Sequence, residues 1–432
     1  MRAHSAVLAT FLLVSLSPAI AVADELAQLR DELARTKALL SELEVRLAAV
    51  EAKRAVEPVQ PAPAAMAGGG SRSSDNAFNP AISVILNGSY NAYSRDPDDA
   101  IVSGFTLGDE AGLPNEGFSL GESELNLSAN IDTMFYGSIT ASLEDDAGDT
   151  EVGVEEAYIE TLSLPYGAKI RAGRMFPVLG YLNEMHSHVD AFVDRPLPYR
   201  AFLGGNNFRD DGIQASVILP TDLFAEMGGG IYRGTGFPAA GSASNGRGTQ
   251  TLFTRFGGDI GVSHSWLAGV SFLRAEADAL ETPDLTFNGT SDIYVADAKY
   301  TWAPAGNLAS RYVALQGEYF WRNQDGSYND AGYEEDTSGW YAQAVYKFLP
   351  RWKAGYRFAR LDPAVVPLGL EGTALDSGGH DPFAHSLVLE FDNSEFSNIR
   401  LQYTRDDSGP RSNDAAVLRY TISMGAHGGH KY

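Results

Sequence analysis

Hydrophobic and polar residues alternate with a period of two over most of the chain beyond residue 80. Near the start of this region Ile82, Val84 and Leu86 alternate with Ser83 and Asn87, and similar alternation recurs towards the end of the chain. Strands with one apolar and one polar face produce this pattern. It predicts strands at residues 81–93, 118–131, 134–145, 152–162, 167–175, 211–219, 223–233, 251–263, 265–277, 291–302, 311–322, 337–348, 351–361, 383–392, 397–405 and 414–424. We therefore predict an all-β fold, a 16-stranded antiparallel transmembrane β-barrel over residues 80–432.

The predicted connections alternate between short and long. Asp132-Thr133, Pro220 to Asp222 and His264 are short, and longer loops lie between them. Transmembrane barrels have tight periplasmic turns and longer outer loops. The competing architecture is a soluble β-sandwich or propeller, which would bury larger aliphatic residues, whereas many apolar-face positions here are Ala, Gly or Tyr. The loop asymmetry favours the membrane barrel, with both of its ends in the periplasm.

A different period governs residues 24–54. Apolar residues recur there at alternating spacings of three and four, at Leu26, Leu29, Leu33, Leu40, Leu43, Leu47 and Val50, with Thr36 at the remaining position. These are heptad core positions, and flanking opposite charges such as Glu25 and Arg30 suit a parallel assembly. The segment predicts a short coiled coil that joins copies of the chain. The alternative is a lone amphipathic helix lying on another surface.

Two further segments complete the predicted organisation. Arg2, the apolar run 6–16 and Ala21-Val22-Ala23 have the order of a secretory signal peptide, so we expect residues 1–23 to be removed. Residues 55–79 are rich in Pro and Ala and then in Gly and Ser, which predicts a linker without a core. The coiled coil over 24–54 would then lie in the periplasm of a Gram-negative bacterium, beneath a barrel in the outer membrane.

Composition narrows the classes of function. The formal net charge is −24, and the chain has no cysteine. A strongly acidic chain is a poor nucleic-acid binder, and the absence of cysteine excludes disulfides and thiolate metal sites. Motifs of serine hydrolases, nucleotide-binding loops and zinc proteases are also absent from the sequence. We therefore expect no enzymatic activity.

Three short stretches resemble a known group of proteins. They are Gly117-Phe118-Ser119-Leu120-Gly121-Glu122-Ser123-Glu124, Asp194-Arg195-Pro196-Leu197-Pro198-Tyr199-Arg200-Ala201-Phe202, and the terminal Gly425-Ala426-His427-Gly428-Gly429-His430-Lys431-Tyr432. With the order of segments, they resemble the porin superfamily, similar to its phosphate-selective members and closest to a family of zinc-regulated outer-membrane proteins. The resemblance covers residues 80–432. It implies a homotrimer, passive diffusion of small solutes, and contact with membrane lipid and lipopolysaccharide. Receptors of the outer membrane carry a plug domain before the barrel, which this chain lacks, so the receptor label sometimes used for that family is in doubt here.

The longest predicted outer loop, residues 176–210, is the candidate constriction. Its aromatic residues could pack against the barrel wall, and the third loop of general porins folds into the lumen. The alternative is a loop lying flat over the mouth. The polar candidates on this loop are Glu184, His186, His188, Asp190 and Asp194.

Histidines suggest a link to metal ions. His186, His188 and Asp190 could approach one Zn²⁺, and His427 and His430 form a second pair. The alternative is that these are polar histidines of the loop and the tail that bind no metal. No cofactor is required by the sequence, and Zn²⁺ is a candidate ligand or cargo.

Charged residues of both signs fall in the lumen-facing phase of the strands. The pore-lining candidates are Lys169, Arg171, Lys299, Lys347, Arg357, Arg400 and Arg419 on the basic side, and Glu124, Glu144, Glu156, Glu160, Asp297, Glu318 and Glu390 on the acidic side. Opposed charges across a narrow pore pass small polar solutes and reject apolar ones. The mixed set predicts no strong anion selectivity.

Three hypotheses for function follow from the sequence. The first is a porin-like channel for passive diffusion of small hydrophilic solutes or ions, linked to zinc or other divalent cations. The second is a structural tether acting through the coiled coil. The third, a barrel hydrolase using Ser187 and His186, requires that sequence neighbours form a nucleophile–base pair, which is geometrically unfavourable.

Overall fold

The computed structural model describes Lys37 and residues 80–425, except 109–110, 147–148, 206, 241–245 and 284. The chain divides into two compact units, Met1–Ser74 and Asp75–Tyr432, and the fold below is that of the second. The predicted signal peptide, the predicted linker, all of the predicted coiled coil except Lys37, and the pair His427 and His430 lie outside the described residues.

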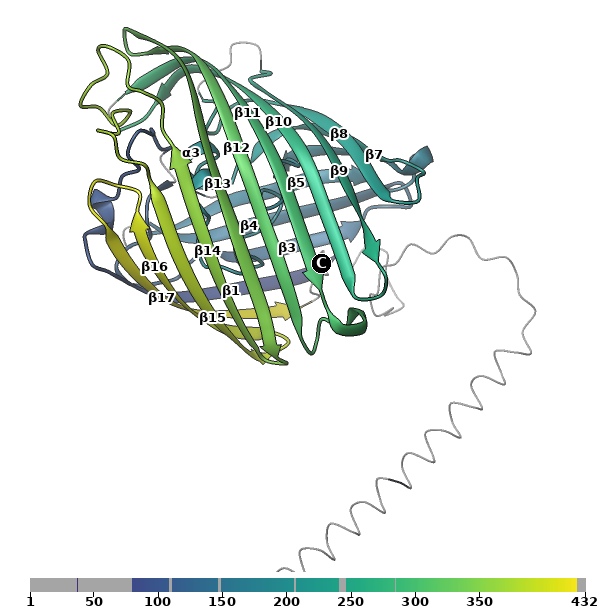
Figure 1. Ribbon diagram of the computed structural model, residues 1–432. Helices are drawn as coiled ribbons and strands as arrows, with labels where there is room; N and C mark the ends of the chain where they lie inside the picture. The colour runs from purple at the N-terminus through teal and green to yellow at the C-terminus, as the bar shows by residue number, and fades with distance from the viewer. Residues whose placement is uncertain are drawn as a thin grey trace, which may run out of the picture. The chain divides into compact units, whose positions relative to one another are not determined.

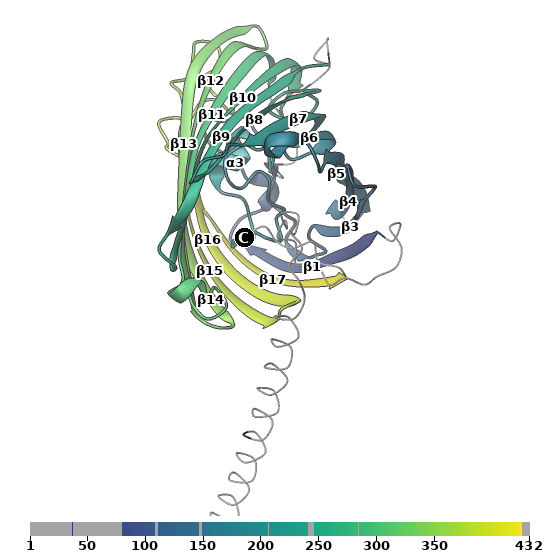
Figure 2. The same ribbon diagram turned by 90° about the vertical axis from the view of Figure 1, so that its right-hand side faces the viewer.

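The second unit is one closed antiparallel sheet (Figures 1 and 2). Its strands are β1 Ala81–Tyr93, β2 Gly117–Ser119, β3 Ser123–Asn130, β4 Phe135–Asp146, β5 Asp149–Thr161, β6 Ala168–Met175, β7 Asp210–Ile218, β8 Phe224–Tyr232, β9 Thr249–Ile260, β10 His264–Glu281, β11 Thr286–Trp302, β12 Tyr312–Tyr328, β13 Ala331–Leu349, β14 Trp352–Asp362, β15 Phe383–Ser394, β16 Ser397–Asp407 and β17 Asn413–Gly425. Pairing of β1 with β17 closes the barrel.

The predicted number of strands around the barrel is confirmed. The short strand β2 and the strand β3 both pair with β1 and are consecutive in the chain, so together they fill one position, interrupted at Leu120–Glu122. With that pair counted once, the barrel has sixteen strands, all antiparallel to their neighbours. Each predicted strand corresponds to one of these positions.

Along each strand, side chains point alternately to the outer face of the barrel and into its lumen. Apolar residues at outward positions are largely exposed, such as Leu252 at 63% and Leu387 at 56%, whereas inward neighbours such as Thr251 and Ser386 are buried. A closed barrel satisfies every strand's backbone hydrogen bonds and presents an apolar outer surface, as a membrane requires. Among the described residues, the helical segments are too short or too polar to span a bilayer.

Four neighbouring strands run further than predicted. Strands β10 to β13 extend the expected 265–277, 291–302, 311–322 and 337–348 by several residues, so the loop expected between 322 and 337 is wrong. Only Asn329 and Asp330 connect β12 to β13, with Asn329 at φ 51°. The extension is held by inward aromatic residues, because Tyr328 packs on Tyr333 with ring centroids 5.0 Å apart. Interspersed polar residues hid this continuing alternation from the sequence prediction.

Two connections that run inside the barrel fill part of the lumen. Residues 94–116 join β1 to β2, and residues 176–209 join β6 to β7 and contain the short helix α3, Leu197–Phe202. Figure 2 shows α3 within the ring of strands. The ring of Phe202 lies 5.7 Å from Phe105 of the first connection and 5.8 Å from Phe320 of β12. An apolar core therefore lies inside the barrel.

The inward face is consequently divided. The inner wall of β10, β11, β12 and β14 carries the apolar residues Leu273, Ile293, Phe320 and Leu361, which form one cluster with residues of α3. The helix itself packs on β12, β13 and β14. The inner wall of β1, β3 and β4 carries polar residues, including Asn87, Asn91, Glu124, Ser138, Thr140 and Ser142. A second apolar cluster, around Phe287, Tyr328, Tyr333, Leu370 and Leu375, covers the extended ends of the long strands. The alternation predicted strands with one polar face, and for the lumen side of β10 to β14 this prediction is wrong.

Candidate functional site

The connection 176–209, called the inner loop below, is anchored to the wall by one buried carboxylate. Glu318 of β12 is 3% exposed. It accepts hydrogen bonds from the backbone N–H groups of Tyr181 and Leu182, at 3.0 and 3.2 Å, and from the hydroxyls of Tyr199 and Tyr341, at 3.0 and 2.6 Å. Burial and the charge of Glu318 raise the pKa of Tyr199 far above 10.0, so its hydroxyl remains a donor. Four neutral donors satisfy this carboxylate.

A second anchor lies at Asp194. Arg357 of β14 donates to the Asp194 carboxylate at 2.6 Å and to its backbone carbonyl at 2.7 Å, and Gln402 of β16 donates to the same carboxylate at 2.6 Å. The guanidinium of Arg357 also lies 4.5 Å from the ring centre of Phe192. The surrounding barrel would raise the pKa of Asp194, whose side chain is 41% exposed, but Arg357 and Gln402 outweigh this effect, so the pKa is lowered from 3.8.

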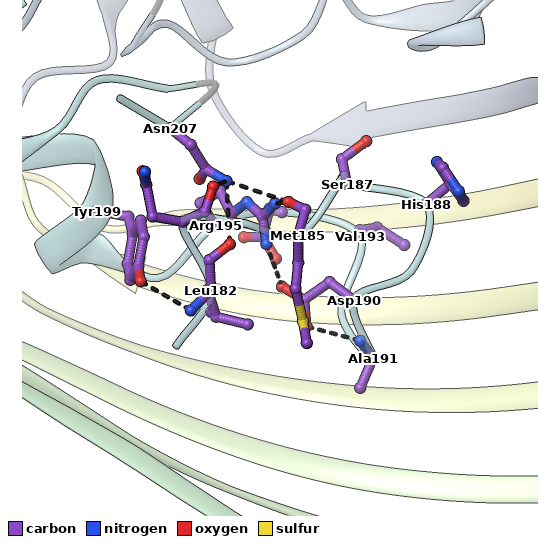
Figure 3. Close-up of polar contacts among 12 residues, drawn as sticks. Leu182, Met185, Ser187, His188, Asp190, Ala191, Val193, Arg195, Tyr199 and Asn207 are labelled. Carbon is purple, nitrogen blue, oxygen red and sulfur yellow. Dashed lines mark hydrogen bonds and ion pairs between the residues drawn. The ribbon is translucent and has the colours of Figure 1, made fainter. Parts of the chain in front are cut away.

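The inner loop is also bonded to itself. Arg195 pairs with Asp190 at 3.0 Å and donates to the backbone carbonyl of Met185, to which Asn207 also donates (Figure 3). The second oxygen of Asp190 accepts from the N–H of Ala191. Asp190 is thus held by Arg195 rather than placed with the two predicted histidine ligands.

The two loop histidines meet three glutamates of the wall. Nδ1 of His186 lies 3.2 Å from Oε2 of Glu124 and 3.1 Å from Oε2 of Glu155, and its Nε2 lies 3.1 Å from Oε2 of Glu156. Nδ1 of His188 lies 2.7 Å from Oε1 of Glu124. These five residues are called the glutamate–histidine cluster. It joins β3, β5 and the inner loop.

A β-bulge builds the wall side of this cluster. The pairing of β4 with β5 shifts between Thr140 and Ala141, so that Glu156 faces Thr140, Val154 faces Ala141 and Glu155 is the additional residue. A bulge sets two residues against one and interrupts the alternation of faces. The adjacent Glu155 and Glu156 consequently both reach His186, while Val154 is 42% exposed on the outer face.

Further polar groups border the cluster. The hydroxyl of Ser187 donates to Glu122, and Arg209 lies 3.9 Å from Glu155. Burial would lower the pKa of His186, but the charge of Glu124 and its hydrogen bonds to glutamates outweigh burial and raise the pKa well above 6.5. Because the hydroxyl of Ser187 bonds the carboxylate of Glu122, the contact does not match the nucleophile–base pair that the hydrolase hypothesis requires.

Most predicted pore-lining charges lie on the inner wall and are paired with a residue of opposite sign. Glu160 bonds Lys169 and Arg171, Glu390 bonds Arg400 and Lys353, Lys347 lies near Asp392, and Glu184 of the loop bonds Arg255. Lys299 donates to the hydroxyl of Tyr181, and Arg419 donates to the carbonyl of Val193. Asp297 is buried on the same face of β11. Glu144 belongs to β4, but its side chain is outside the described part of the structure.

Sequence reasoning missed several of these residues. Glu155 was absent from the candidates because strict alternation places it on the lipid side, and Glu122, Arg195 and Arg255 were also absent. A charged residue at an outward position is costly in a lipid-facing strand. The consecutive Glu155-Glu156 inside a predicted strand was therefore a usable signal for a bulge.

Comparison with known proteins identifies one clear relative. No protein-family model matches the chain. An uncharacterized protein of Aquifex aeolicus (strain VF5) is 30% identical over 398 residues, which cover 83% of this chain and 81% of the relative. This similarity extends over about four-fifths of each protein.

Solved structures with the same fold are outer-membrane channels. The outer membrane channel DcaP of Acinetobacter baumannii superposes with a TM-score of 0.53 at 11% identity, over 80% of this chain and 97% of that chain. The anion-selective porin from Comamonas acidovorans gives a TM-score of 0.51 at 12% identity, over 80% and 99% of the two chains. At such low identity the likeness concerns the fold. The chain therefore belongs to the family of the Aquifex aeolicus protein and has the fold of the outer-membrane porins.

Proposed function

We propose that this protein is an outer-membrane channel for passive diffusion of small hydrophilic solutes or ions, narrowed by its inner loop. The observation that carries the proposal is the attachment of this loop to opposite sides of the inner wall. Glu318 of β12 and Arg357 of β14 hold one side, and Glu124 of β3 holds the other. A segment fixed across a barrel in this way reduces the cross-section open to solutes.

The charge pattern supports a preference for small polar solutes. Apolar side chains and α3 fill the lumen beside β10 to β14, so we place the open path along the polar wall of β1 and β3 to β6. Apart from the glutamate–histidine cluster, charges on that wall occur as opposite pairs, as in Lys169–Glu160 and Arg171–Glu160. Paired charges of both signs favour neither anions nor cations strongly.

The assembly follows from the same proposal. We propose a homotrimer whose exposed outer apolar residues, such as Ile213, Leu252 and Val270, contact lipid and neighbouring subunits. The predicted contact with lipopolysaccharide and the tether role of residues 24–79 stay predictions. The proposed connection to zinc is developed in the next section.

The experiment is single-channel recording of the purified full-length protein in a planar bilayer under a salt gradient. Stable conductance steps with a weak ion preference are expected. Glu318→Ala, which removes the acceptor of hydrogen bonds from three groups of the inner loop, is expected to give larger or noisier steps. Tyr319→Phe, its outward-facing neighbour, is the matched control and should conduct like the unsubstituted protein.

Failure of the proposal has a defined signature. A properly folded barrel that shows no conductance, either with the natural sequence or with Glu318→Ala, would overturn the channel. In that case the tether becomes the leading hypothesis, and deletion of residues 24–78 should produce envelope defects.

A further inference from the structure

We infer that Glu124, Glu155 and His186 form a binding site for a first-row divalent metal cation between the barrel wall and the inner loop. The site differs from the set expected from sequence, because Asp190 pairs with Arg195 and two wall glutamates take part instead. The inference stands apart from the proposed channel function, since metal binding is measured without any solute flux.

The geometry of three potential ligand atoms carries the inference. One ligand atom from each of Glu124, Glu155 and His186 lies within 4.8 Å of the other two. They come from β3, from β5 and from the inner loop, so their convergence depends on the folded barrel. One imidazole nitrogen with two carboxylate oxygens is a ligand set that suits Zn²⁺ and neighbouring first-row metals. Small shifts of these side chains bring the three atoms to coordination distance around one ion.

The surrounding residues match the support that metal ligands receive in proteins. A ligating imidazole usually donates its second N–H to a carboxylate, which fixes the orientation of the ring. Nε2 of His186 lies 3.1 Å from Glu156 and can make this bond while Nδ1 binds the metal. His188 contacts the other oxygen of Glu124 at 2.7 Å and orients that carboxylate.

A separate observation outside the cluster points to a ligand. The Ser142 hydroxyl is completely buried and has no hydrogen-bond partner among the described residues. Ser142 is directly opposite Glu124 in the pairing of β3 with β4 and opposite Gly153 in the pairing with β5. Its oxygen lies 3.0 Å from where a Cβ of Gly153 would be, toward the strand that carries Glu155. Buried hydroxyls are nearly always bonded, so this oxygen indicates a bound ion or ion-bound water beside Glu124.

The charge balance also favours a cation. Glu124 and Glu155 are 4% and 1% exposed, and Glu156 and Glu122 lie beside them. Buried carboxylates require compensation by positive charge. Two imidazoles and the more distant Arg209 face the carboxylates of Glu124, Glu155 and Glu156, and a divalent cation would replace the positive charge that the imidazole protons supply.

The test is isothermal titration of Zn²⁺ into the full-length protein, purified folded from membranes and stripped with a chelator. His427→Gln and His430→Gln are introduced first, because the terminal histidines form a separate candidate pair. We expect one Zn²⁺ bound per chain in this background. Loss of binding is expected for His186→Gln and for Glu155→Gln, and Glu156→Gln should weaken binding by about 10- to 100-fold.

Matched controls separate a specific site from general attraction of cations. His385→Gln removes an outward histidine that bonds Tyr356, and Glu160→Gln removes a lumen glutamate from the same strand as Glu155. Both controls should leave the affinity for Zn²⁺ unchanged. Heat-dependent mobility in gel electrophoresis verifies that each variant is folded.

Zinc-edge X-ray absorption of the unsubstituted site gives a readout that needs no variant to fold. One coordinated imidazole with oxygen ligands supports the site, and a spectrum without imidazole overturns it. Absence of Zn²⁺ binding in the tail-substituted protein, or equal binding by folded His186→Gln, overturns it as well. In either case a protonated His186 bridging the glutamates accounts for the cluster.

Discussion

The inner loop meets the barrel wall at two buried acidic sites that differ in composition. At the first, the single carboxylate of Glu318 receives two backbone N–H groups and two tyrosine hydroxyls. At the second, Glu124, Glu155 and Glu156 surround His186. Neutral donors complete the first site, whereas acceptors outnumber donors at the second. The first site therefore attaches the loop to the wall, and the second is the site where we propose that a cation binds.

The largest expected effect comes from removing the acceptor at the first site. Glu318→Ala removes the acceptor of the Tyr181 N–H and of the Tyr199 and Tyr341 hydroxyls, and each buried donor left without a partner costs about 1–3 kcal/mol. The N–H of Leu182 retains the Tyr199 hydroxyl as a partner. Local opening of the inner loop should become easier by on the order of 3 kcal/mol, measured by amide hydrogen exchange over residues 178–185. Tyr341→Phe removes one donor and should have a smaller effect, of about 1 kcal/mol. Unchanged exchange in Glu318→Ala would show that the attachment lies elsewhere.

Removal of bound metal tests the second site, the glutamate–histidine cluster. If the cluster binds Zn²⁺, saturation at about 100 times the dissociation constant stabilises the loop–wall contact by about 2.7 kcal/mol. Chelation should accelerate hydrogen exchange near His186 and His188 and leave Tyr181 and Leu182 unaffected. Equal acceleration at both sites would mean that the two attachments open together.

Acidification should weaken the attachment at Asp194. A carboxyl whose pKa is lower in the folded than in the unfolded state stabilises the fold above its unfolded pKa, and this is lost as the pH falls through the folded pKa. For Asp194 the loss therefore occurs below its ordinary value of 3.8. Exchange of Phe192 and Val193 measured down this range should accelerate in the natural protein. The same profile should be flatter in Asp194→Asn, and identical profiles would contradict the role of this pair.

The smallest effect is expected at an ion pair that neither site uses. Lys169 is 42% exposed and lies 3.2 Å from Glu160, and solvent-exposed pairs contribute between about 0 and 1 kcal/mol. Lys169→Gln should leave loop exchange unchanged and shift the reversal potential slightly towards cations. A large loss of stability in this variant would indicate that wall charges support the loop indirectly.

Strand number and strand phase could be predicted because each strand repeats one simple rule. Ile82, Val84 and Leu86 face outward and Ser83 and Asn87 face inward, as their alternation predicted. The rule fails where long-range packing replaces lipid and water as the environment. Phe320 is apolar on the lumen side because Phe202 of the inner loop packs on it, and nothing local to β12 specifies that contact.

The candidate site shows the same division between local and long-range information. The sequence marked His186 and His188 through their spacing, and Glu124 and Glu156 through their strand phase. Glu155 was missed because a one-residue bulge reverses its side. Asp190 was grouped with the histidines from proximity in sequence, but its charge pairs with Arg195 five residues later. Spacing identifies residue types, and the fold decides which of them meet.

The lengthened strands β10 to β13 have a consequence for how the barrel meets the outside. Strand β13, Ala331–Leu349, is about 60 Å long at about 3.3 Å per residue. The apolar band of such barrels is only about 25 Å tall, and a strand tilt near 40° does not remove the difference. One side of the rim therefore stands well clear of the bilayer, lined inside by Tyr328 and Tyr333. A solute that reaches the mouth of the barrel therefore meets a high wall on the side of β10 to β13 and a lower rim on the opposite side.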